Sequence, residues 1–233
     1  MVQKVDFSKR NFLKTAGIGI GLIAAHKIFR GCDSDYLTGP YSKFGPQYMD
    51  VLNMRRPVLG MAEARVTLLE ISDYNCIGSK RVQGTLDRLL QEYVGELNLT
   101  HINFPILKNS EVAARAVEAA GKQGKYWLMH NMLFRTGKTD INGVKEIARD
   151  IGLNTEQFAR DFESQEIAAS VARQKEAALG LKLISTPVFI IGINGSDLAK
   201  NGVFIFGAAG IQEFEKVISG LLDSRSSGHG RQG

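Results

Sequence analysis

Between residues 65 and 222, the apolar residues follow two kinds of pattern in turn, one typical of buried strands and one typical of helices. Residues 65–72 (RVTLLEIS) form a short, apolar, β-branched run that is typical of a buried strand. Residues 77–93 follow with apolar side chains at helical spacing, and residues 97–104 (LNLTHINF) predict the next strand. The order strand, helix, strand predicts a crossover unit with two parallel strands.

Helical patterns then continue through residues 110–181, interrupted by glycine and asparagine. Asn109 or Ser110 is a candidate N-cap for the first of these helices, and Asn154 or Thr155 for a later one. We therefore expect several short helices in succession, inserted between the first and last parts of a sheet.

Strand patterns return at residues 186–193 and 202–207, and an amphipathic helix is predicted over residues 211–222. The polar residues 223–233 are typical of a disordered tail. The complete order is β-α-β, a helical insertion, then β-β-α. It predicts an α/β protein with the topology of the thioredoxin fold, in a domain over residues 57–222.

The amino-terminal residues 1–31 have the pattern of a signal for export. Residues 8–14 (SKRNFLK) precede the apolar residues 16–25, and this segment resembles a twin-arginine signal with Lys9 in place of the first arginine. The apolar run is shorter than the roughly 20 residues of a membrane span. We expect the export machinery as a partner, a periplasmic or cell-envelope location, and membrane contact through this segment alone. An amphipathic N-terminal helix is the alternative.

Residues 32–56 mix Gly, Pro, Tyr and charged residues without a period, as in a linker or arm. Cys32 opens this segment. The residues before it only partly resemble a lipoprotein signal, so lipidation at Cys32, a free thiol in the arm and an uncleaved signal all stay open. Cys32 is also a candidate partner of Cys76 in a disulfide that would act as a redox latch.

The net charge of +5 does not describe the folded part of the chain. Residues 1–31 hold six Lys or Arg and one Asp, which leaves 23 basic and 23 acidic residues in the remainder. The body is therefore neutral, and its composition predicts no nucleic-acid partner.

The motif DYNCIGSK (residues 73–80) places Cys76 at the junction of the first predicted strand and helix. Unpaired backbone N–H groups at a helix start favour a negative charge, so we expect a lowered thiol pKa and a reactive thiolate. Ser79 stands three residues later, where its hydroxyl can donate a hydrogen bond but cannot close a disulfide. The alternative for a single cysteine is a small buried apolar side chain.

Four segments in this order resemble the DsbA-like thiol-disulfide oxidoreductases: residues 57–76, 113–134, 185–192 and 207–218. The resemblance implies a nucleophilic Cys76, with Ser79 replacing the second cysteine of the family's C-x-x-C motif. It also implies a buried acid at Glu70, for which an outward-facing surface acid is the alternative. Pro187 matches the family's cis-proline, and Thr186 would pair its backbone with an extended client; a trans proline that opens an edge strand is the alternative.

The sequence implies no cofactor. His101 in a strand and His130 in a helix have no visible ligand set, so no metal site is predicted. Tyr126, Trp127 and nearby apolar residues are interpreted as core. The predicted function is an exported monothiol oxidoreductase or isomerase that forms mixed disulfides with protein thiols or disulfides, or with glutathione-like thiols. The alternative is a redox-inactive thioredoxin-fold binding module or chaperone.

Overall fold

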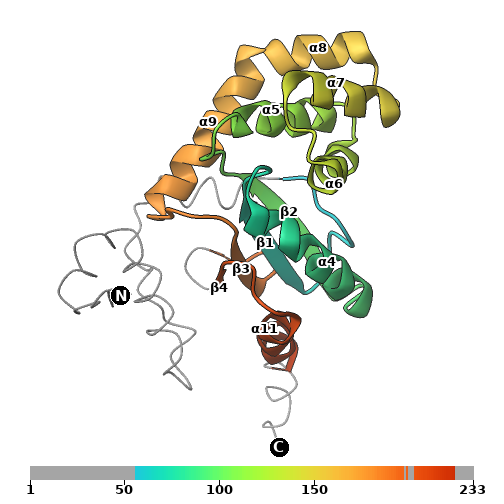
Figure 1. The fold of residues 1–233 in the computed structure, drawn as a ribbon. Helices are drawn as coiled ribbons and strands as arrows, with labels where there is room; N and C mark the ends of the chain where they lie inside the picture. The colour runs from blue at the N-terminus through green and yellow to red at the C-terminus, as the bar shows by residue number, and fades with distance from the viewer. Residues whose placement is uncertain (1–55, 197, 199–201, 224–233) are drawn as a thin grey trace, which may run out of the picture. The chain divides into compact units, whose positions relative to one another are not determined.

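The structure, a computed structural model, describes residues 56–196, 198 and 202–223 (Figure 1). The predicted export signal, nearly all of the predicted linker with Cys32, and the predicted tail after residue 223 lie outside the described residues. Predictions about these segments, and the domain boundaries drawn from them, therefore stay predictions.

A four-stranded sheet forms the centre of the described part, in the order β2-β1-β3-β4. β1 (Val66–Ser72) and β2 (Leu97–Asn103) are parallel, and α4 (Ile77–Glu92) connects them. β3 (Val188–Ile193) and β4 (Val203–Phe206) complete the sheet in antiparallel pairs. The crossover predicted from the hydrophobic pattern is confirmed, and β1 lies inside the sheet with both edges paired.

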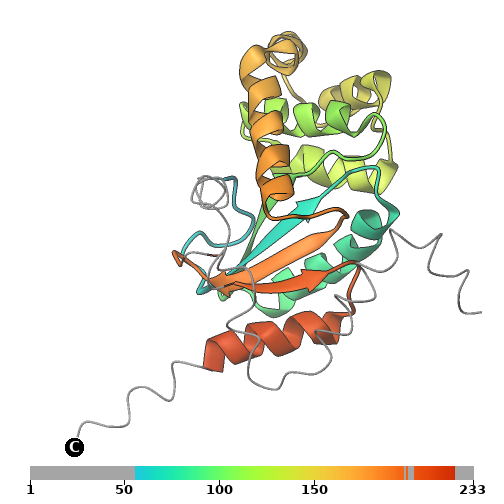
Figure 2. The same ribbon diagram turned by 90° about the vertical axis from the view of Figure 1, so that its left-hand side faces the viewer.

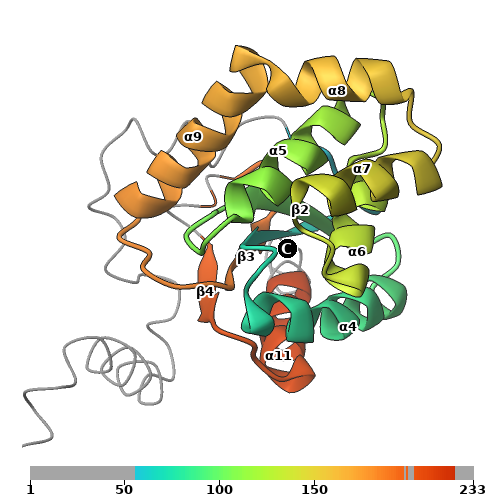
Figure 3. The same cartoon turned by 45° about the horizontal axis from the view of Figure 1, so that its top comes forward.

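Five helices occupy the chain between β2 and β3 (Figure 3). Figure 2 shows them above the strands and the last helix, α11 (Ile211–Asp223), below. The five helices are α5 (Ser110–Gly121), α6 (Tyr126–Thr136), α7 (Ile141–Asp150), α8 (Thr155–Glu163) and α9 (Gln165–Gly180).

The two faces of the sheet bury different apolar side chains. Val66 and Leu68 pack with side chains of α4 and α11, whereas Leu69 and Ile71 pack with residues at the end of α9 and beyond. Because strand side chains alternate between faces, Glu70 belongs to the face that α4 covers. The insertion has a core of its own, formed by α5 to α8.

Side-chain caps define several helix starts. Asn154 accepts a hydrogen bond from the backbone N–H of Gln157, as predicted for an N-cap. Asn109 also stands at an N-cap position, but it has a φ of 63° and its side chain makes no capping hydrogen bond. The neighbouring Ser110 hydroxyl instead donates to Asp73, 2.5 Å away.

Asp73 joins the end of β1 to the loop that follows β2. Its Oδ2 accepts hydrogen bonds from the backbone N–H groups of Ile106 and Leu107, each at 2.9 Å. Its Oδ1 accepts one from the backbone N–H of Asn75, besides the one from Ser110. One buried carboxylate therefore ties the loop that leads into α4 to the loop that leads from β2 into α5.

We predict that Asp73→Ala lowers the free energy of unfolding by about 2 to 4 kcal/mol, because it leaves buried donors without an acceptor. Urea denaturation measures this loss. Asp87→Ala on the exposed side of α4 is the control and should stay within about 0.5 kcal/mol of wild type. An equal effect of both substitutions would contradict the role given to Asp73.

Candidate active site

Cys76 is the N-cap residue of α4. Its backbone is extended, with φ −81° and ψ 123°, and its carbonyl accepts the first helical hydrogen bond, from the N–H of Lys80. No acidic residue lies in the first turn of α4. The half-buried sulfur therefore stands at the positive end of a 16-residue helix, without a nearby helical carboxylate to oppose a thiolate.

The loop before β3 lies directly against this helix start. The Thr186–Pro187 peptide bond is cis, as the family resemblance implied. The Cys76 thiol donates to the backbone carbonyl of Thr186, with 3.3 Å between sulfur and oxygen. A methyl group added to Gly78 would lie 3.1 Å from Pro187 Cδ, so glycine permits the close approach of helix and loop.

The surroundings of Cys76 lower the pKa of its thiol. Partial burial by itself raises that pKa, but hydrogen bonding from the Thr186 side chain, from the backbone N–H and hydroxyl of Ser79, and from the N–H of Gly78 outweighs burial. The site thus favours the thiolate, the form that attacks disulfides.

Ser79 replaces a second thiol with a buried hydroxyl. Its Oγ makes no hydrogen bond of normal geometry within the described residues, but the hydroxyl is among the groups that lower the pKa of Cys76. The hydroxyl can stabilise the thiolate, but it has no sulfur with which to form a disulfide.

Glu70 is fully buried beneath α4, which excludes the outward-facing alternative. Its Oε1 accepts a hydrogen bond from Gln83 Nε2 at 2.8 Å, and the same nitrogen also donates to the carbonyl of Ser79. Burial raises the pKa of Glu70 from its ordinary 4.5 to about 7, although Ser72 and Gln83 oppose the increase. Glu70 is therefore connected to the active-site turn and titrates near neutral pH.

A cluster of buried polar and aromatic side chains continues from Glu70, and the sequence prediction missed it. His101 Nε2 pairs with Ser72 Oγ at 2.9 Å, and His101 Nδ1 pairs with the Tyr126 hydroxyl at 2.7 Å. Tyr74 OH pairs with Nδ1 of His130 at 2.9 Å. The interpretation of Tyr126 as core is confirmed by its burial, but its hydroxyl belongs to this polar cluster.

The sequence contains a signal for this cluster. Glu70 and Ser72 have the spacing of one strand face, and Tyr126 and His130 have the spacing of one helix face, in each case within apolar patterns. Polar side chains on buried faces need partners, so each of these two pairs marks a buried polar site. Matching one pair to the other also requires the topology that brings β1, β2 and α6 together.

Exposed apolar side chains stand on segments that flank Cys76. Ile77 is 75% exposed in the first turn of α4, and Ile184 is 69% exposed shortly before Thr186. Leu107 is exposed in the loop that Asn75 holds through its hydrogen bond to the carbonyl of Lys108. The rim of the site is thus partly apolar.

Cys32, a predicted site residue, lies outside the described residues, and Cys76 is a free thiol. Among the residues described, no group of three or more His, Cys, Asp or Glu could hold a metal ion. No helix in this same part of the chain is long and apolar enough to cross a membrane.

We predict that Ser79→Ala raises the pKa of Cys76 by up to about one unit, because the thiolate loses one hydrogen-bond donor. The rate of alkylation of Cys76 as a function of pH measures the change. Cys32→Ala should be present in both proteins, so that a single thiol reacts. A Ser79→Ala protein with an unchanged pKa would show that the hydroxyl does not act on the sulfur.

We also predict that the free energy of unfolding of Glu70→Gln, relative to that of wild type, increases between pH 5 and pH 8. The increase should be about 2 to 3 kcal/mol. Between its ordinary pKa of 4.5 and its folded pKa of about 7, Glu70 holds a proton only in the folded state. Wild type therefore loses stability as pH rises through this range, and the glutamine variant does not. Urea titrations at both pH values measure the difference, and a constant difference would contradict the buried, protonated carboxyl.

Comparison with known proteins identifies the family. A family model described as thioredoxin matches residues 53–201. Among curated proteins, the Na(+)/H(+) antiporter NhaA of Herminiimonas arsenicoxydans is 27% identical over 135 residues, and NhaA 1 of Mycolicibacterium gilvum is 31% identical over 144 residues. The matches cover 58% and 59% of this chain but 22% and 23% of those antiporters, so the chain spans about a fifth of their length.

Solved structures agree with this result. A thioredoxin-like oxidoreductase from Silicibacter pomeroyi is 30% identical with a TM-score of 0.63, covering 83% of this chain and 99% of that one. The thiol-disulfide exchange protein α-DsbA2 from Wolbachia pipientis is 21% identical with a TM-score of 0.65, covering 75% and 92%. A periplasmic thioredoxin-like protein from Salmonella enterica is 18% identical with a TM-score of 0.65, covering 78% and 100%. The chain belongs to the thioredoxin family and has a DsbA-like fold.

Proposed function

We propose that this protein is an exported monothiol thiol-disulfide oxidoreductase that forms mixed disulfides through Cys76. The observation that carries the proposal is the pairing of a half-buried, thiolate-favouring Cys76 with a buried Ser79 hydroxyl. An inert structural cysteine is expected to be buried among apolar atoms with a raised pKa. Similarity to an oxidoreductase from Silicibacter pomeroyi and to the thiol-disulfide exchange protein α-DsbA2 adds support.

The proposed reaction has two exchanges. In the first, the Cys76 thiolate attacks a client disulfide, one S–S bond forms to Cys76, and the client's other sulfur leaves as a thiolate. In the second, an outside thiolate attacks the mixed disulfide and Cys76 leaves as a thiolate again. The outside sulfur is either the client's own second cysteine or a small thiol. Ser79 stabilises the thiolate at the start and end of this cycle, but it cannot perform the second exchange.

Client binding is proposed at the loop that contains Thr186 and Pro187. An extended chain beside this loop could pair with the backbone of Thr186, whose carbonyl faces the Cys76 sulfur. Ile77 and Ile184 expose apolar surface on the two segments that flank the sulfur. This surface suits an unfolded or extended client with apolar side chains near its cysteine.

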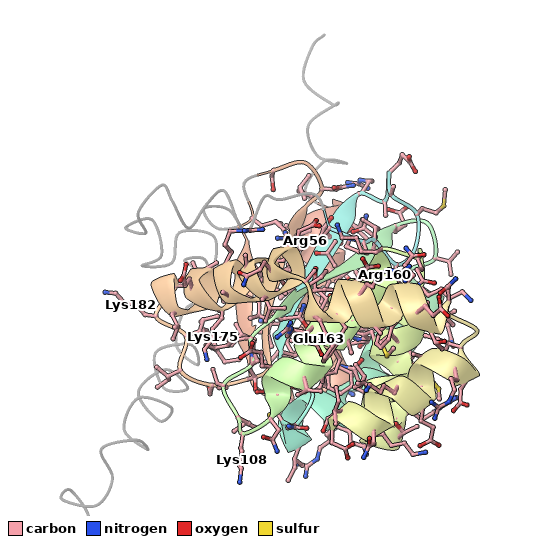
Figure 4. The ribbon with its side chains drawn as sticks, turned by 90° about the horizontal axis from the view of Figure 1, so that it is seen from above. Arg56, Lys108, Arg160, Glu163, Lys175 and Lys182 are labelled. Carbon is pink, nitrogen blue, oxygen red and sulfur yellow. The ribbon has the colours of Figure 1, made fainter. Side chains whose placement is uncertain are left out.

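The charges around the site suit an anionic small thiol such as glutathione as the releasing partner. Lys80 is exposed in the first turn of α4, and Lys108 extends away from the loop after β2 (Figure 4). Both cations belong to segments that border the Cys76 region. A carboxylate-bearing thiol would therefore approach the sulfur through a region of positive charge.

Glu70 is proposed as the acid-base group of the site. Its pKa of about 7 allows it to exchange a proton at neutral pH, and Gln83 connects it to the carbonyl of Ser79.

Export is proposed from the twin-arginine-like segment. The periplasmic description of the Salmonella enterica protein supports the same compartment.

A redox-inactive client-binding module is the second candidate. The replacement of the resolving cysteine by Ser79 favours it, because such a protein would keep the client surface without turnover. The lowered pKa of Cys76 argues for retained reactivity, since simple client binding needs no thiolate.

The test uses the full reduced chain with Cys32→Ala and a disulfide-bonded model peptide. We expect Cys76 to accumulate as a mixed disulfide, visible by mass under non-reducing conditions, and added reduced glutathione to release it. Ser79→Cys should release the peptide without glutathione, because its second thiol can attack the mixed disulfide.

Cys76→Ala is the matched control and should form no adduct. Adduct formation slower than that of an unstructured cysteine peptide would contradict the proposed activity. Equal peptide binding by Cys76→Ala and the parent, together with that slow reaction, would favour the binding module.

A further inference from the structure

Two buried polar atoms face each other beneath the active site, and neither has a hydrogen-bond partner among the described residues. They are Oε2 of Glu70 and Nε2 of His130, both fully buried and 3.8 Å apart. This distance is too long for a hydrogen bond. Because buried polar groups are rarely left unpaired, the two atoms call for a physical explanation.

The opposite side of the His130 ring is fixed. Its Nδ1 pairs with the Tyr74 hydroxyl at 2.9 Å. The ring also packs edge-on against Tyr74, His101, Trp127 and Phe134, with centroids 4.8 to 5.5 Å apart. The imidazole therefore has little freedom to turn, and its Nε2 stays directed at Glu70.

The charge state of the ring limits what this nitrogen does. Burial lowers the pKa of His130 to about 3, so the imidazole is neutral at physiological pH and carries one N–H. If the Tyr74 hydroxyl donates to Nδ1, that N–H is on Nε2 and points to the Glu70 carboxylate. A neutral imidazole N–H can stabilise the ionised carboxylate without the cost of burying a second charge.

We propose that His130 is a positioning residue that stabilises the ionised form of Glu70 through its Nε2–H, with Tyr74 fixing the required tautomer. Ionisation of Glu70 strengthens the attraction between the two side chains and draws them into a charge-assisted hydrogen bond. His130 thereby keeps the carboxylate available as a proton acceptor near neutral pH. Only this last consequence rests on the proposed function.

The other polar groups that the structure describes around Glu70 make no hydrogen bond to Oε2. Gln83 from α4 donates to Oε1. The Ser72 hydroxyl lowers the pKa of Glu70, but it pairs with His101 of β2 and makes no hydrogen bond of normal geometry to Oε2. Tyr126 of α6 pairs with His101. Within the described residues, His130 is thus the side chain placed to donate a hydrogen bond to Oε2 of Glu70.

Two charged side chains border the cluster, and they shift the pKa values of its other members. Arg56 acts on His101 and Tyr126, and Glu118 of α5 acts on Tyr74 and Tyr126. Burial, Ser72 and Gln83 are the causes that shift the pKa of Glu70. Because His130→Phe leaves Ser72, Gln83, Arg56 and Glu118 in place, a change in the titration of Glu70 in this variant would report on its pairing with His130.

The first experiment reads the tautomer of His130 in the reduced full-length wild-type chain. Nitrogen-15 NMR of the imidazoles at pH 9, with His130 assigned by its absence from His130→Phe, distinguishes Nε2–H from Nδ1–H. We expect Nε2–H. A ring protonated on Nδ1 at this pH would overturn the proposal.

The second experiment follows the Glu70 carboxyl band by infrared difference spectroscopy during a pH titration, with Glu70→Gln identifying the band. In His130→Phe, which keeps an aromatic ring in place, we expect the midpoint to rise by about one pH unit. Tyr93→Phe removes a hydroxyl that pairs with Ser219, outside this cluster, and should leave the midpoint unchanged. An unchanged or lower midpoint in His130→Phe would overturn the proposal.

These measurements are independent of disulfide exchange. An unreactive Cys76 would defeat the proposed function and leave both results as predicted. A purely structural His130 would change thermal stability in the phenylalanine variant but would not move the Glu70 midpoint.

Discussion

The close contact between the first turn of α4 and the Thr186–Pro187 loop is the constraint on which the site depends. It joins segments 110 residues apart in the chain, with the Cys76 sulfur 3.3 Å from the Thr186 carbonyl. Gly78 permits this approach because even a methyl side chain would press against Pro187. The sheet brings the two segments together, since β1 leads into α4 and its antiparallel neighbour β3 begins just after Pro187.

Beneath this contact, the protein buries groups that a purely structural core would exclude. Glu70 stands among apolar side chains on the α4 face of the sheet, where burial raises its pKa and costs stability once it ionises. Buried charges and unpaired polar atoms are expensive, and they concentrate at functional sites. The cluster of Glu70, His101 and His130 places such groups beneath Cys76, where the proposed disulfide exchange would take place.

Much of the fold follows from local pattern. The strand over residues 65–72 and the helix over residues 77–93 were predicted within one residue of β1 and α4, because a short continuous apolar run differs clearly from helical spacing. Cys76, Ser79, Thr186 and Pro187 were linked by family resemblance, and the structure brings them together. The local pattern marks Glu70 and His130 as polar residues on buried faces, but their proximity depends on how α6 packs against the sheet, and no local pattern encodes that contact.

The most direct test of the central claim is the equilibrium of the complete reduced chain with a glutathione redox buffer, analysed by mass spectrometry after acid quenching. A monothiol centre should show one glutathione on Cys76 in a fraction that depends on the ratio of oxidised to reduced glutathione. Cys32→Ala should leave that fraction unchanged. A disulfide between Cys32 and Cys76, or a Cys76 that stays unmodified at every ratio, would contradict the account.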